Sequence, residues 1–132
     1  MVEITIQSKG FNQSYDITKQ VTDALSQLEP PSGVAKVCVT GSTVGLTVMR
    51  YEPGTTQDLL QCLESIASKN KKYEHFNTTG DPNGFSHVWS SMMGTSVMVP
   101  YKNHKLACSE SHRIVLFDFD LREAERKIYV DR

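Results

Sequence analysis

The sequence is poor in several features that mark whole classes of protein. Its 132 residues carry a formal net charge of −1, so it lacks the basic surplus that nucleic-acid and anionic-membrane binding require. No stretch approaches the roughly 18 consecutive apolar residues of a membrane span. The N-terminal MVEITIQSKG alternates polar and apolar residues where a signal peptide has an apolar core. These absences predict one cytoplasmic domain, residues 1–132, with neither nucleic acid nor a membrane as partner.

Cysteine is also scarce. The three cysteines, Cys38, Cys62 and Cys108, are odd in number, widely spaced and form no CxxC pair. A disulfide framework or a cysteine-rich zinc site needs closer pairs. We interpret them as reduced thiols in or near the core, because strand and helix patterns account for all three positions. A catalytic cysteine is the alternative.

Hydrophobic periodicity predicts about eight strands and three helices. The strands are expected at 2–8, 12–18, 34–40, 44–51, 95–100, 105–108, 113–119 and 126–130, and the helices at 18–28, 55–69 and 82–93. The first two strands would form a hairpin, and the next two a second hairpin or a closely connected pair. Residues 70–80 are expected to be a polar loop. Since the last four strands are consecutive, the pattern predicts an α+β fold with a mostly antiparallel, β-sandwich-like core.

The most informative segment is DPNGFSHVWSSMMG, residues 81–94. Asp81 followed by Pro82 predicts a helix start, and Gly94 predicts its end. Helical spacing gathers an apolar stripe on one side, formed by Phe85, Val88, Trp89 and Met92. It gathers polar residues on the opposite side: Asn83, His87 and Ser90.

This polar side has two interpretations, a solvated surface or the wall of a ligand site. Asn, His and Ser form helices less readily than the Glu, Lys and Gln that usually populate solvated faces. The segment also offers no i,i+4 salt bridge. Composition alone leaves both interpretations open.

Histidine is rare, with four residues in the chain: His75, His87, His104 and His112. Imidazole can bind a divalent metal or move a proton near neutral pH. His75 lies in the loop that leads to the helix of His87, so the two side chains could converge. Their spacing matches no short zinc signature such as HExxH. His104 fits an exposed turn, and His112 opens a strand where either interpretation applies.

Five segments together resemble the YjbQ family, whose members are also described as secondary thiamine-phosphate synthase enzymes. They are YEH (73–75), DPNGFSH (81–87), SSMMGTSVMVP (90–100), GSTVGLTV (41–48) and RKIYV (126–130). The resemblance implies a YjbQ-like α+β fold assembled as a homotrimer. It also implies a pocket for a metal or an anion at or near the subunit boundary.

The resemblance implies site residues as well. The pocket histidines of the family correspond to His75 and His87, its asparagine to Asn83 and its C-terminal arginine to Arg126, with the first three as candidate catalytic residues. The chain departs from the family pattern at three positions. Gly41 replaces a histidine, Arg50 stands where a carboxylate is common, and His112 replaces a glutamine.

Two ligands follow from these residues. A zinc-like divalent metal would be held by His75, His87 and, as a third ligand, His112. A phosphate-like anion would instead be held by hydrogen-bond donors and positive charge at Ser42, Thr43, Arg50, Arg126 and His112. The replacement of an acid by Arg50 favours the anion. The resemblance then implies thiamine-phosphate synthase-type activity, and the alternative is a non-catalytic homotrimeric small-molecule or anion-binding protein with a degenerate active site.

Overall fold

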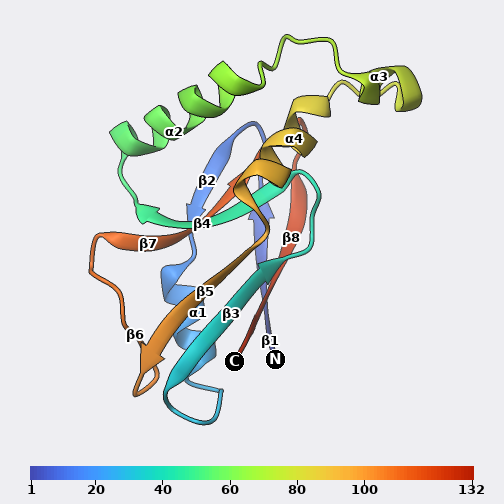
Figure 1. Ribbon diagram of the computed structural model, residues 1–132. Helices are drawn as coiled ribbons and strands as arrows, with labels where there is room; N and C mark the ends of the chain where they lie inside the picture. The colour runs from blue at the N-terminus through green and yellow to red at the C-terminus, as the bar shows by residue number, and fades with distance from the viewer.

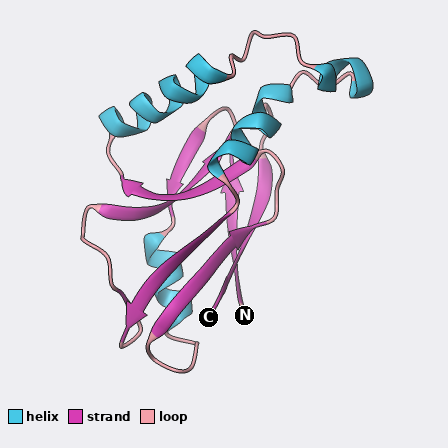
Figure 2. Cartoon of the chain, viewed as in Figure 1, coloured by secondary structure: helices cyan, strands magenta, loops and turns pink.

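The computed structural model describes residues 1–132 as two antiparallel sheets and four helices (Figures 1 and 2). The strands are β1 (Val2–Ser8), β2 (Gln13–Asp16), β3 (Gly33–Val39), β4 (Val44–Arg50), β5 (Ser96–Lys102), β6 (Lys105–Leu106), β7 (His112–Asp118) and β8 (Ala124–Asp131). The helices are α1 (Thr18–Leu25), α2 (Pro53–Ile66), α3 (Glu74–Thr79) and α4 (Gly84–Met93). The predicted α+β class with an antiparallel core is confirmed. No helix is both long enough and apolar enough to cross a membrane.

The two sheets enclose the main core together with α1. The five-stranded sheet has the order β1-β8-β3-β5-β6, and the three-stranded sheet has the order β2-β7-β4. A cluster of 16 buried apolar residues draws on both sheets and on α1, which contributes Val21, Ala24 and Leu25. Burial of this apolar surface is the main source of favourable folding free energy.

The three-stranded sheet is buried on both faces, which explains the unbroken apolar run of β7. Ile114 and Leu116 face the main core, while Val115 and Phe117 face a second cluster beneath α2 and α4. Trp89 of α4 lies in this second cluster. Its Nε1–H donates to the Ala67 carbonyl at 2.8 Å and so joins α4 to the end of α2.

Both predicted hairpins are wrong. β2 pairs with β7 and not with β1, and β3 and β4 lie in different sheets. The short 40–43 link carries the chain from one sheet to the other, so it crosses a seam instead of turning a hairpin. Strand pairing is a long-range property that adjacency in sequence does not determine.

Two helix predictions also need correction. The expected loop at 70–80 contains α3, and α4 begins at Gly84 and not at Pro82. The Asp81 carboxylate is engaged by Arg122 and does not cap the helix. Along α4, Ser86 and Ser90 are buried while Val88 and Met92 are exposed. Ser86 donates to the Phe119 carbonyl just after β7, and Ser90 donates to the Val44 carbonyl of β4, so the buried face is rotated from the purely apolar stripe.

Candidate functional site

A polar pocket of about 580 Å³ opens at the seam between the two sheets. The 40–43 link, α3, the start of α4, the β7–β8 link and β8 all contribute to it. Its twelve lining residues include no hydrophobic side chain: Thr40, Gly41, Ser42, Thr43, His75, Thr79, Asp81, Asn83, His87, Asp120, Arg122 and Arg126. Such a lining suits a polar or charged ligand.

Two histidines form one wall, with ring centroids 4.5 Å apart. His87 Nδ1 lies 3.0 Å from the Ser42 carbonyl oxygen, which only accepts, so Nδ1 carries the proton. His75 Nε2 lies 3.1 Å from Asn83 Oδ1 and donates to it in the same way. In the neutral rings, His87 Nε2 and His75 Nδ1 are therefore left as acceptors. Each ring is oriented through one nitrogen and keeps the other for a ligand or a proton.

Arg126 of β8 is anchored beneath the pocket by Asp118 of β7. Arg126 Nε lies 2.8 Å from Asp118 Oδ2, and Nη2 lies 3.1 Å from Asp118 Oδ1, a bidentate pair. Burial opposes the charge of this guanidinium, but the hydrogen bonds and charges of Asp118 and Asp120 together outweigh burial and raise the pKa of Arg126. The pair joins the two sheets at the base of the site.

Gly41 leaves one edge of Arg126 open to the pocket. The Arg126 bonds to Asp118, Thr43 and Asp120 come from Nε and Nη2, and Nη1 supplies none of them. A Cβ at position 41 would lie 3.3 Å from Nη1 and 2.9 Å from Val44 Cγ2. A side chain at this position would crowd both groups, so glycine keeps the Nη1 edge accessible.

Asp120 connects the histidine wall to the arginine. It accepts hydrogen bonds from Asn83 Nδ2 at 3.3 Å and from Thr43 Oγ1 at 3.1 Å. Burial alone would raise the pKa of Asp120, but the Leu121 N–H and these two side-chain donors together lower it. Asp120 is thus held in its ionised form.

The rim and base of the pocket nearly balance in charge. At the rim, Arg122 Nη2 lies 2.9 Å from Asp81 Oδ2. Three carboxylates, Asp81, Asp118 and Asp120, face the two guanidinium groups of Arg122 and Arg126. The net charge is −1 with both histidines neutral and becomes +1 when both are protonated. The histidines therefore set the sign of the field that a ligand meets.

The structure brings most of the predicted site residues together. Six of them line the pocket: His75, His87, Asn83, Ser42, Thr43 and Arg126. His87 and Asn83 share the pocket wall as the helix pattern allowed.

Arg50 and His112 do not join the pocket, and their expected placement there is wrong. They are cross-strand neighbours at the far ends of β4 and β7. β4 meets the pocket beside Val44, and Arg50 lies six positions further along the strand, roughly 20 Å away.

The residues present do not fit a zinc site within one chain. Zinc requires three or four protein ligands. No group of three or more His, Cys, Asp or Glu side chains in the chain could hold a metal ion. His112, the expected third ligand, pairs with Arg50 and not with the two pocket histidines.

Four charged residues of the site were not predicted as site residues from the sequence. They are Asp118, Asp120, Arg122 and, at the rim, Asp81. The available signal was DFDLR, 118–122, where charges follow directly after a buried strand. A buried carboxylate needs a partner, so Asp118 could have pointed to Arg126.

Comparison with known proteins agrees with this architecture. The UPF0047 protein YjbQ-like family matches residues 2–132. A UPF0047 protein of Archaeoglobus fulgidus is 29% identical over 96% of this chain and 97% of its own length. The UPF0047 protein YjbQ of Salmonella typhimurium is 26% identical over 96% of this chain and 91% of its own.

A solved structure leads to the same family. The crystal structure of an uncharacterized conserved YjbQ/UPF0047 family protein from Clostridium acetobutylicum superposes with a TM-score of 0.87 at 27% identity. The match covers 99% of this chain and 98% of that one. Sequence and fold thus agree over nearly the whole length, and the chain belongs to the YjbQ-like UPF0047 family.

Proposed function

We propose that the pocket binds a small phosphate-like anion and that His75 and His87 carry protons for chemistry on it. The observation that supports this most directly is the histidine pair itself. Each ring is oriented by one hydrogen bond and keeps its second nitrogen unengaged. Two such imidazoles in one pocket can act as a general acid and a general base.

An anion suits the remaining donors. The open Nη1 edge of Arg126, beside Gly41, presents N–H groups of a planar guanidinium that can donate hydrogen bonds to an oxyanion. Hydroxyl groups of Thr40 and Ser42 lie along the same wall, while that of Thr43 already donates to Asp120. Protonation of the histidines adds the positive charge that a phosphate requires.

The pocket could serve either of two functions, catalysis of group transfer or binding without turnover. The resemblance to secondary thiamine-phosphate synthases favours transfer of a phosphate-bearing group, with Asn83 orienting the ligand through its bond to His75. The glycine at position 41 favours the alternative, a protein that binds the anion without turnover. The chain is also proposed to act as a homotrimer.

Binding is tested by calorimetric titration with inorganic phosphate at a single pH. His87→Ala should weaken binding by roughly tenfold, the loss of one hydrogen bond to a charged ligand. His112→Ala is the matched control and should leave the affinity unchanged. Equal affinities for the wild type and His87→Ala would refute the pocket as the phosphate site.

A second readout separates the two outcomes. Thiamine phosphate formation from the pyrimidine pyrophosphate and the thiazole phosphate is measured with the same proteins. An enzyme should exceed background and fall at least about tenfold in His87→Ala, as removal of a general acid or base does. Phosphate binding with background turnover in every variant would establish the non-catalytic alternative.

A further inference from the structure

A second concavity of about 460 Å³ lies beside the polar pocket, and Asp81 forms a wall of both. It is formed by the α2–α3 segment, α3 and the start of α4, and we call it the lysine groove. Its lining residues are Lys69, Lys71, Lys72, Tyr73, Phe76, Asn77, Asp81, Pro82 and Gly84. Its character differs from that of the pocket, because it combines ammonium groups with aromatic rings.

The positive charge of the lysine groove is largely uncompensated. Lys71 and Lys72 form no ion pair with any carboxylate. Lys69 lies close enough to Glu64 to help lower the pKa of that carboxyl, after the larger effects of hydrogen bonds from Ser68 and the Lys69 N–H. The one acid in the lining, Asp81, is already paired with Arg122. Two ammonium groups therefore remain available to an anion.

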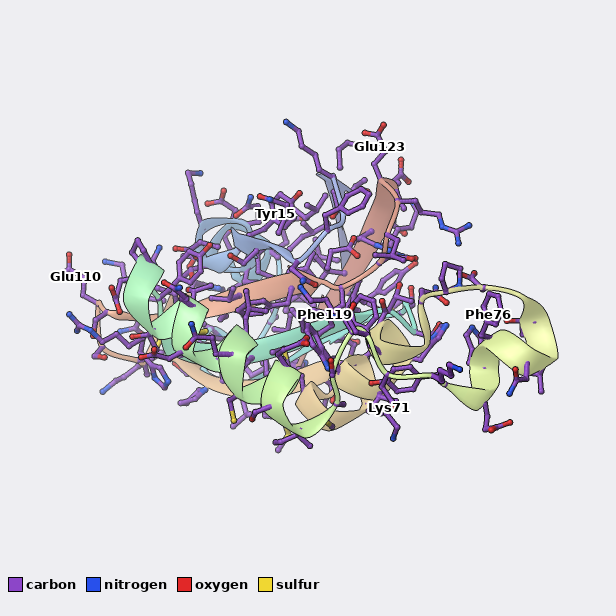
Figure 3. All side chains as sticks on the ribbon, turned by 90° about the horizontal axis from the view of Figure 1, so that it is seen from above. Tyr15, Lys71, Phe76, Glu110, Phe119 and Glu123 are labelled. Carbon is purple, nitrogen blue, oxygen red and sulfur yellow. The ribbon has the colours of Figure 1, made fainter.

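The aromatic part of the groove has one fixed ring and one exposed ring. Tyr73 donates its hydroxyl to the Ser68 carbonyl at 2.7 Å, and Lys71 Nζ lies 5.5 Å from its ring centroid. Phe76, on α3, is 55% exposed. Figure 3 labels Lys71 on the segment before α3 and Phe76 on α3 itself. An exposed phenylalanine beside uncompensated lysines offers a face on which a planar ring can stack.

We propose that the lysine groove is a second binding site, which takes a phosphorylated aromatic ring. The ring stacks on Phe76, and Lys71 and Lys72 contact the phosphate as point charges. A compound with the phosphate alone lacks the stacking contact, and a ring alone lacks the charge. The groove therefore prefers aryl phosphates to alkyl phosphates of equal charge.

Two probes test this preference: phenyl phosphate and methyl phosphate, which carry the same charge and differ in the ring. Binding is followed by NMR through the backbone amide signals of residues 69–73, 76 and 77, which line the groove side and not the polar pocket, so the two sites are read separately. Phenyl phosphate should bind the groove at least about fivefold more tightly, the lower end of what stacking on an aromatic side chain contributes.

Two groove variants test the two contacts. Phe76→Leu keeps an apolar side chain and should reduce the preference for the ring to below about twofold. Phe11→Leu, at another exposed phenylalanine, is its control and should keep the preference. A Lys71→Gln, Lys72→Gln double variant should weaken both probes by roughly fivefold, as expected for two exposed charge contacts. Lys105→Gln in β6, at the opposite end of the molecule from α3 (Figure 1), should weaken neither.

Binding at the groove should persist in His87→Ala, which affects the pocket only. This variant separates the groove proposal from the pocket proposal, since either can fail alone. The groove proposal is overturned if the amide signals of residues 69–73, 76 and 77 do not respond to millimolar phenyl phosphate. Equal responses to the two probes, or an unchanged preference in Phe76→Leu, overturn it as well.

Discussion

Asp120 accepts hydrogen bonds from Asn83, Thr43 and the Leu121 N–H, so a single carboxylate connects the start of α4, the 40–43 link and its own loop. These bonds outweigh the cost of burial and lower its pKa. A carboxyl whose pKa is lowered by folding stabilises the folded state at pH values above its unfolded pKa. That contribution disappears as the pH falls through the lower, folded pKa.

Asp120→Asn should therefore be destabilising in a pH-dependent way. At pH 7 the loss of a charged acceptor should lower the free energy of unfolding by about 1.5–3 kcal/mol. The difference in unfolding free energy from the wild type should shrink progressively below about pH 4, where Asp120 of the unfolded chain begins to protonate. Urea unfolding at pH 7 and at pH 3 measures it. Glu123→Gln, in the same loop but exposed, serves as the control.

A difference between wild type and Asp120→Asn that is equally large at both pH values would contradict this account. It would mean that the shape of the side chain, and not its charge, is what the fold requires at this position.

Helix α4 illustrates which parts of an element can be predicted from sequence. Its existence and its end at Gly94 follow from local signals, and both are observed. Its start does not, because Arg122, far away in sequence, engages Asp81. Its buried face could not be predicted either, because Ser86 and Ser90 donate to the carbonyls of Phe119 and Val44, which only the tertiary fold brings near.

The close approach of Gly84 to Tyr73 at the start of α4 can be tested by mutation. Replacing a helix glycine with alanine usually stabilises by about 1 kcal/mol. A Cβ at Gly84, however, would lie 2.6 Å from Tyr73 Cβ, which the chain fixes in place. Gly84→Ala should therefore lower the free energy of unfolding, by about 1–3 kcal/mol as overpacking does.

Gly54→Ala in α2 is the matched control. Its Cβ would lie 3.1 Å from the flexible end of Glu52, so this variant should be neutral or mildly stabilising. Thermal unfolding of both variants makes the comparison. Similar melting temperatures for the two variants would show that Tyr73 does not restrict the helix start.

For the molecule as a whole, the sequence predicted the class of fold better than its topology. Alternating and apolar runs indicated eight strands in an antiparallel core, and eight are present. The assignment of β3 and β4 to different sheets could not be predicted, because it depends on β7 pairing with β4, whose partners are 62 (Arg50 and His112) to 74 (Val44 and Asp118) positions apart in the chain. The same long-range pairing places Arg50 and His112 together and away from the pocket.

The outer face of the five-stranded sheet bears on assembly. Val34 is 48% exposed and Met98 is 71% exposed on adjacent strands β3 and β5, with Pro100 opposite Val34 and Lys36 opposite Met98. Exposed apolar side chains such as Val34 and Met98 are suited to contact with a further copy of the chain, and the family resemblance implies three copies.

Light scattering at micromolar concentration should give three times the 14.8 kDa mass of the chain. Met98→Glu should shift the protein toward the monomer, because association would take the new carboxylate and its cross-strand neighbour Lys36 out of water. Met98→Leu should leave the mass unchanged. A wild-type mass of one chain would exclude the trimer, and a trimeric Met98→Glu would exclude this face as its interface.

The Asp118–Arg126 pair has a consequence for how such a protein drifts over evolutionary time. It joins β7 of one sheet to β8 of the other, so the groups that shape the pocket floor also hold the two halves of the fold together. A lineage that loses its original catalytic activity would still lose folding stability if it replaced Asp118 or Arg126. Selection for a folded chain alone is then enough to preserve Asp118 and Arg126, whether or not the pocket keeps an activity.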